Sequence, residues 1–261
     1  MTLDFTLNKY AELCLKIQEL QRKTMTVTQF IKAKQPQQPI VILRHDIDRS
    51  LSRAVRMAEL EASYGIQSTY YARTTRAVSK PELLEYLVQL GHELGYHYET
   101  LARAKGNYKR AIELFTDELK ILRQIGPIET ISMHGSPLLP WNNLDLWQSY
   151  DYKLYGVQEV YLSIDYQKAY YFSDTGRSWN SNHYNLRDHV DSLLPDSSIH
   201  TTDDLITFLR QQLDGPVLIN VHPNRWTKGT LEYILQVGQD TFINFIKVGL
   251  LIIRKRDSVY S

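Results

Sequence analysis

Cysteine is nearly absent from this sequence: Cys14 is the single one, so no disulfide bond can form within the chain. It lies in a helical pattern, where a buried thiol is the expected state. Long apolar runs are also lacking. The most apolar run near the C-terminus, residues 242–253, is interrupted by Asn244 and Lys247 and is too short to cross a bilayer. Residues 1–20 carry charged side chains where a signal peptide needs an apolar stretch, so we expect a cytoplasmic protein.

An excess of one charge sign is missing as well, with 30 Lys and Arg residues against 29 Asp and Glu. The formal net charge of +1 creates no field that would attract nucleic acid or an anionic membrane surface. Any partner is therefore recognised locally, and we expect neither a nucleic-acid partner nor a membrane span. No internal repeat or low-complexity tract is present, and 261 residues suit a single large domain.

Short apolar runs alternate with helical patterns along most of the chain, and the region 138–200 is less regular. Helices are expected over residues 6–22, 26–33, 51–64, 81–90, 108–125, 201–213 and 229–246. Strands are expected over residues 40–45, 67–73, 92–97, 129–135, 168–173 and 215–223. Repeated strand-then-helix units predict an α/β fold with a parallel sheet, either closed as a barrel or open and doubly wound.

Ionisable residues follow five of the predicted strands. In order along the chain they are Arg44, His45, Asp46 and Asp48, then His97 and Glu99, then His134, then Asp174, and finally His222. Ligands of both candidate architectures bind at the carboxyl ends of the strands. Scattered surface charges would not coincide with strand ends in this way, so the pattern predicts a shared active site.

Asp46 and Asp48 alternate at the end of the first strand, so both carboxylates can reach the same rim. One can bind a divalent cation together with neutral imidazoles, while the other serves as a general base. The alternative for Asp48 is that it caps the following helix, whose N-terminus favours an anion.

The histidines also allow two interpretations. His97 alone would more often be a hydrogen-bonded structural residue, but its place beside the Asp pair favours a metal ligand. His134 precedes Gly135, which either lets the backbone approach a ligand or only makes a turn. His222 precedes Pro223 in the last strand, and Trp226 either walls a sugar-sized pocket or packs in the core. We interpret His92 as structural and leave three unassigned: His183, His189 and His200.

These motifs resemble the polysaccharide deacetylase family, the NodB-homology group of carbohydrate esterase family 4, over about residues 39–225. LRHDID is similar to its Asp-Asp motif with one spacer residue, HELGYHYET to its metal-binding motif, and VLINVH to its last motif. The resemblance implies that Asp46 is the catalytic base, Asp48 and His97 are metal ligands, and His222 protonates the leaving amine. YFSDTGRSW implies that Asp174 orients a catalytic partner.

Two positions depart from the family pattern. Leu101 stands where the family has a second metal-binding histidine, and it cannot bind metal. The first candidate for the third ligand is therefore His134 and the second is Glu99. The alternative is that the metal is absent. SMHGSP replaces the motif that supplies an arginine near the base, and Arg44 is the candidate to provide the compensating charge.

The resemblance implies a distorted α/β barrel of about seven parallel strands over residues 39–261, a helical extension over 1–38, and one domain in all. It also implies a divalent ion, with zinc first and iron, cobalt and nickel also compatible with His and carboxylate ligands. The expected reaction removes an N-acetyl group from an amino sugar, nucleotide- or lipid-linked, in the assembly of a surface polysaccharide such as lipopolysaccharide. The alternatives are hydrolysis of a non-sugar amide and a carbohydrate-binding barrel that has lost catalysis.

Overall fold

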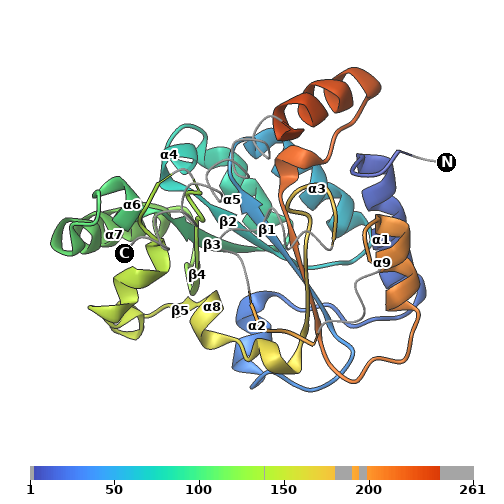
Figure 1. The fold of residues 1–261 in the computed structure, drawn as a ribbon, viewed down its shortest axis with the longest axis horizontal. Helices are drawn as coiled ribbons and strands as arrows, with labels where there is room; N and C mark the ends of the chain where they lie inside the picture. Colours follow the sequence, from blue (N-terminus) through green and yellow to red (C-terminus); the bar gives the residue numbers. More distant parts are fainter. Residues whose placement is uncertain (1–2, 138, 180–189, 194–198, 242–261) are drawn as a thin grey trace, which may run out of the picture.

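The computed structural model describes residues 3–137, 139–179, 190–193 and 199–241. Parallel strands form one curled sheet, half of a barrel, in the order β5-β4-β3-β2-β1-β7-β6 (Figure 1). Their bounds are β1 Val41–Ile47, β2 Thr69–Ala72, β3 Glu93–Tyr98, β4 Thr130–Met133, β5 Gln158–Glu159, β6 Tyr170–Ser173 and β7 Val217–Val221. The predicted α/β fold with about seven parallel strands is confirmed.

The helices follow the predicted order. The α-helices are α1 Leu7–Glu19, α2 Val27–Lys32, α3 Leu51–Ser63, α4 Thr74–Ala77, α5 Pro81–Gln89, α6 Thr100–Arg103, α7 Tyr108–Leu122, α8 Val160–Ser163 and α9 Thr202–Leu209. Turns of 3-10 helix are η1 Asn143–Gln148, η2 Tyr152–Tyr155, η3 Tyr166–Lys168 and η4 Pro223–Arg225. Residues 230–241 are helical too. The expected continuation of this helix to residue 246 lies outside the described residues, as does the apolar run 242–253.

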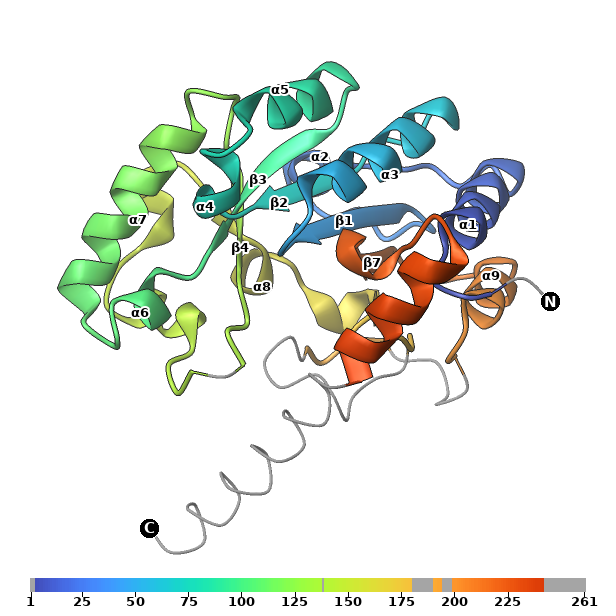
Figure 2. The ribbon, with the colours of Figure 1, turned by 90° about the horizontal axis from the view of Figure 1, so that it is seen from above.

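Side chains of β1 alternate between the two faces of the sheet, as the period of a strand requires. Leu43 packs on the convex face in a hydrophobic cluster with residues of α1 and α9. Ile42 packs inside the half-barrel with Tyr71 and Leu218. Figure 2 shows α3, α5 and α7 along the convex side of the sheet. The concave side is therefore left for the polar residues that follow Ile42 on the same face.

Neighbouring strands explain how the first and last predicted site residues come together. β1 pairs with β7 in parallel, with His45 opposite Val221. Both strands lie in the interior of the sheet, and β5 and β6 form its edges. The short β5 was missed, because two residues carry no readable alternation.

The described helices bear on membrane association in one respect. Within the described ranges, no helix combines the length and apolar character that crossing a bilayer would demand.

Candidate active site

Asp48, His97 and His134 come together at the carboxyl ends of β1, β3 and β4. One potential ligand atom from each residue lies within 4.8 Å of the others. Oδ1 of Asp48 is 3.5 Å from Nε2 of His97 and 3.4 Å from Nε2 of His134. This Oδ1 atom is buried and has no hydrogen-bond partner in the structure. A buried acceptor between two imidazole nitrogens is the arrangement expected of a metal site.

Strand register brings the two imidazoles to this point. His97 on β3 is paired with Ser132 on β4, and the amide of His134 continues this pairing by donating to the Tyr98 carbonyl at 2.7 Å. Nδ1 of His97 lies 3.0 Å from the Ser132 carbonyl oxygen. Because a carbonyl only accepts hydrogen bonds, it fixes the proton on Nδ1 and leaves Nε2 of His97 free to face Asp48.

The helix-capping interpretation of Asp48 is wrong. The side chain of Ser50 caps α3 by accepting a hydrogen bond from the Arg53 amide. Burial raises the pKa of Asp48, but the nearby imidazoles of His97, His134 and His222 bring it well below its usual value. Asp48 is therefore an ionised carboxylate, and its charge is available to a cation.

The position of the family's second histidine is buried in the core. Leu101 lies in α6, is 2% exposed and belongs to the hydrophobic cluster on the convex side of the sheet. Glu99, the second candidate for the third ligand, does not join the group of three. Its Oε2 lies 3.2 Å from Nδ1 of His134, and its other oxygen pairs with Arg73. The geometry therefore favours His134 over Glu99 as the third ligand.

Asp46 lies one step inside the half-barrel, on the same face of β1 as Arg44. Nη2 of Arg44 donates to both of its oxygens, at 3.1 and 3.0 Å, and Nδ2 of Asn220 donates to Oδ2 at 3.1 Å. Burial raises the pKa of Asp46, but Arg44 first, and then His97 and His222, lower it overall. Arg44 is thus placed to compensate the charge of Asp46, and Asp46 is held ionised.

Two aromatic rings hold Arg44 in place. Its guanidinium carbon lies 5.3 Å from the centre of the Tyr71 ring and 5.1 Å from that of Tyr161, and its Nη2 donates to Ser132 Oγ at 2.7 Å. The glycine of the second motif makes room for this arrangement. Gly95 is paired with Tyr71, and a Cβ at Gly95 would overlap the Tyr71 ring.

His222 and Asp174 form a second pair, located just after β7 and just after β6. Nδ1 of His222 lies 2.6 Å from Oδ1 of Asp174, and the His222 amide donates to Oδ2 at 2.9 Å. Burial raises the pKa of Asp174, but Arg225 and His222 lower it to about 2. Because an ionised carboxylate only accepts, Asp174 places a proton on Nδ1 of His222 and leaves Nε2 as the nitrogen available for proton transfer. Asn220, two positions before His222, donates to Asp46, and His222 lowers the pKa of both Asp46 and Asp48, so the two pairs lie near each other on one rim.

Trp226 does not wall a pocket. It is 1% exposed, packs against Phe5 and Tyr10, and donates from Nε1 to Oδ2 of Asp174 at 2.9 Å. The sequence did not reveal two further residues that contact the candidate acid and base: Asn220 and Arg225. Asn220 precedes His222 by two positions on the same strand, so period-2 alternation could have placed it at Asp46.

Three other histidines among the described residues lie away from the metal group. His45 faces the convex side, where its Nε2 lies 2.7 Å from Glu61. His92 is buried, with contacts to the Ala58 carbonyl and to Ser68, as expected of a structural residue. His200 is exposed. His183 and His189 lie outside the described residues.

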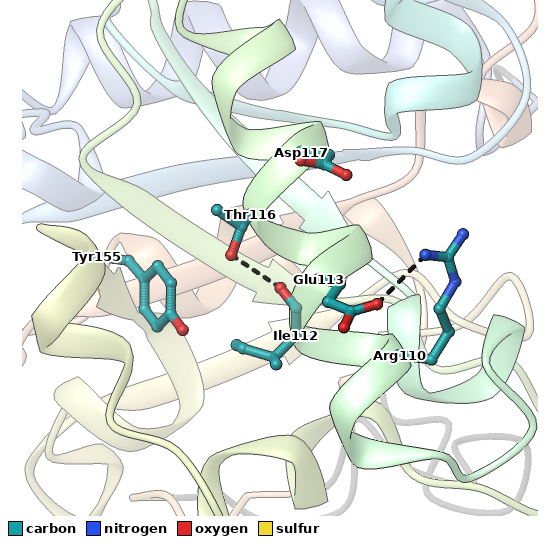
Figure 3. A pocket seen from close by; sticks show the side chains of 6 residues that line it. All are labelled: Arg110, Ile112, Glu113, Thr116, Asp117 and Tyr155. Carbon is teal, nitrogen blue, oxygen red and sulfur yellow. Dashed lines mark hydrogen bonds and ion pairs between the residues drawn. The ribbon is translucent and has the colours of Figure 1, made fainter.

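A surface hollow of about 350 Å³ lies elsewhere, between α7 and η2. Figure 3 shows the residues that line it, which are Arg110, Ile112, Glu113, Thr116, Asp117 and Tyr155. None of them is a predicted site residue. It is an open surface feature with an exposed ion pair, Arg110 to Glu113 at 3.4 Å.

No protein-family model and no curated protein sequence matches this chain. Among solved structures, it is similar to a CE4 family pseudoenzyme from Bacillus anthracis, with 10% identity and a TM-score of 0.46 over 79% of this chain and 62% of that one. It is also similar to a family 4 carbohydrate esterase from Streptomyces lividans in complex with acetate, with 15% identity and a TM-score of 0.42 over 78% and 87%.

These two structures carry the name of the family that the sequence motifs resemble. A peptidoglycan deacetylase from Bacillus subtilis is similar at 14% identity and a TM-score of 0.39, over 84% of this chain and 97% of that one. This chain spans less than two thirds of the length of the Bacillus anthracis protein. At such low identities and TM-scores, activity has to be inferred from the side chains of this chain itself.

Proposed function

We propose that this protein is a metal-dependent hydrolase that removes an N-acyl group, most simply N-acetyl, from an amino sugar. One observation supports this above all. An Asp-His-His group of metal-ligand geometry lies on the same rim as an ionised carboxylate, Asp46, and an Asp-supported histidine, His222. Metal, base and acid are the three parts that amide hydrolysis requires.

The donors suit a divalent transition metal. Two imidazole nitrogens and one carboxylate oxygen make the three-ligand set typical of catalytic zinc, in which the remaining positions stay open. The unpartnered, buried Oδ1 of Asp48 supports the same assignment. A cation bound there would act as a Lewis acid that polarises the amide carbonyl and stabilises the charge developing on its oxygen. We propose zinc, while iron, cobalt and nickel share these ligand preferences.

The residues of this chain then divide the proton transfers. Asp46, held ionised by Arg44 and Asn220, accepts a proton from the attacking water as the water oxygen bonds to the carbonyl carbon. His222, as an imidazolium whose Nδ1 proton is held by Asp174, donates its Nε2 proton to the departing nitrogen as the carbon–nitrogen bond breaks. The proton taken up by Asp46 balances the one given by His222, and the products are a carboxylic acid, which ionises at neutral pH, and a free amine.

The proposed substrate is an amino sugar carried by a nucleotide or a lipid, acted on in the cytoplasm during assembly of a surface polysaccharide. The near-neutral charge of the chain leaves recognition of such a substrate to the side chains around the rim. Hydrolysis of a non-sugar amide would use the same three parts, so the substrate panel below includes one.

The test combines metal content with product release. The purified protein should contain close to one equivalent of a divalent metal by elemental analysis. It should release acetate from at least one compound in a panel of free, nucleotide-linked and lipid-linked N-acetylated sugars, with N-acetylated amino acids as the non-sugar class. A protein with bound metal that is active only on the non-sugar class would overturn the substrate. A protein that binds no metal would overturn the proposed mechanism.

A further inference from the structure

A second contact of His134 is not used by the mechanism above. Its Nδ1 atom, on the side of the ring away from Asp48, lies 3.2 Å from Oε2 of Glu99 and 3.0 Å from Oγ of Ser136. A hydroxyl can donate or accept a hydrogen bond, so Ser136 alone does not determine which nitrogen of His134 carries the proton. An ionised carboxylate only accepts, and it therefore places that proton on Nδ1.

Glu99 is held in place by an ion pair with Arg73. Nε and Nη2 of Arg73 both donate to the same oxygen, Oε1, with the Nε contact at 3.1 Å. Because Arg73 occupies Oε1, the other oxygen is directed to His134. Glu99 is 8% exposed, so water competes little for either contact.

We propose that Glu99 is a positioning residue, clamped by Arg73, that selects the tautomer of His134 in which Nε2 can bind a metal. This inference rests on the proposed metal site and gives Glu99 a role outside the ligand set. In this arrangement the third imidazole follows β4, and its orientation depends on a carboxylate that follows β3. Carboxylates in such contacts raise the basicity of a ligating imidazole and fix its ring.

Replacement of Glu99 by glutamine makes a sharp test, because Arg73 has only donors to offer. The amide oxygen of the introduced glutamine must then face Arg73, and its amide nitrogen must face Nδ1 of His134 as a donor. The proton of His134 is thereby moved to Nε2, the atom that should bind the metal. In the metal-free protein, imidazole nitrogen NMR should report the Nδ1-protonated tautomer in wild type and the Nε2-protonated tautomer in Glu99→Gln. The His134→Ala variant assigns the signal.

Glu118→Gln is the matched control. Glu118 is also 8% exposed and also pairs with an arginine, Arg103, but it accepts its other hydrogen bond from Tyr96, away from the metal group. Zinc affinity, measured by competition with a chromogenic chelator, should fall roughly 10- to 100-fold in Glu99→Gln and stay at the wild-type value in Glu118→Gln. Urea unfolding of the metal-free proteins checks that both variants fold.

Three results would overturn the positioning role of Glu99. Wild-type zinc affinity in Glu99→Gln would show that the clamp has no effect on the site. Loss of zinc as complete as in His134→Ala would make Glu99 itself a ligand. An unchanged His134 tautomer would remove the mechanism. If wild type binds no zinc but the tautomer changes as expected, the proposed function fails while the clamp stands.

Discussion

Nε2 of His134 lies 3.4 Å from Oδ1 of Asp48, although the two residues follow strands β4 and β1, which are not neighbours in the sheet. Leu101, the residue that matches the family's usual ligand position, is in the core instead. We therefore predict that the metal affinity of His134→Ala falls by more than the roughly 10- to 100-fold expected when a contact outside the ligand set is removed. Elemental analysis after dialysis checks this. Stoichiometric metal at unchanged affinity would exclude His134 as a ligand.

A histidine at position 101 should not repair that loss. Leu101→His in the His134→Ala background would place an imidazole in a hydrophobic cluster, where burying an unpartnered polar group costs roughly 1 to 3 kcal/mol. We expect the double variant to be less stable in urea than His134→Ala and to remain without metal. Restored metal binding would show that α6 can turn this position toward the site.

Asp46→Asn should separate binding from catalysis. The change keeps the shape of the side chain and removes the proton acceptor, so kcat should fall on the order of 10²- to 10⁴-fold. Metal content should be preserved, because Asp46 is not one of the three grouped ligands. The assay is product release under saturating substrate. Near-normal kcat would exclude Asp46 as the base.

Asp174→Asn should impair proton donation by His222. The side-chain oxygen of the introduced asparagine would accept from the His222 amide and the Trp226 indole. Its side-chain nitrogen would then face Nδ1 of His222 as a donor, where the carboxylate now accepts. We expect kcat to fall on the order of 10²-fold with metal content unchanged. His222→Ala is the reference variant. Were Asp174→Asn to match wild type at every pH, Asp174 would have no role in positioning His222.

Acid should destabilise the fold through Glu61. Burial raises the pKa of Glu61, but His45 and further hydrogen-bond donors bring it to about 2, below the roughly 4.3 of an unfolded glutamate. The native state thus favours the ionised form, so this stabilisation is fully present above about pH 4.3 and is lost as pH falls through 2. It amounts to on the order of 3 kcal/mol.

The measurement is urea unfolding of metal-free protein at several pH values between 2 and 7. Wild type should lose free energy of unfolding toward low pH more steeply than Glu61→Gln. Parallel curves for the two proteins would show that Glu61 does not titrate differently in the folded state.

Gly95→Ala tests packing under the same conditions. It should cost roughly 1 to 3 kcal/mol at every pH, because the added methyl group displaces Tyr71.

The sequence was sufficient to predict which residues lie along most of the rim. Asp46, Asp48, His97 and His222 each lie at or just after the end of a short apolar strand, so the strand pattern alone brings them to one edge of a parallel sheet. Partners from other elements were not visible in this way. Arg225, for example, reaches Asp174 from a 3-10 turn that has no repeating pattern.

Trp226 shows a different limit. Its pattern suits a pocket wall and a core position equally, and only the packing against Phe5 from the N-terminal segment decides between them. The order of the strands in the sheet was not predicted for a related reason. Strand order depends on which hydrophobic faces pack together across the molecule, and no local signal encodes it.

The alternation along β1 also constrains how the chain can fold. Arg44 and Asp46 face Ser132 and Asn220 inside the half-barrel, while His45 between them faces Glu61 on the other side. A shift of one residue would send both charges to the convex face and leave Leu43 in the polar interior. Mispaired forms of this central strand therefore forfeit several charged contacts at once. The catalytic candidates thus also specify the register of β1. Variants that neutralise them should refold through a more heterogeneous set of strand pairings, even where the final structure is preserved.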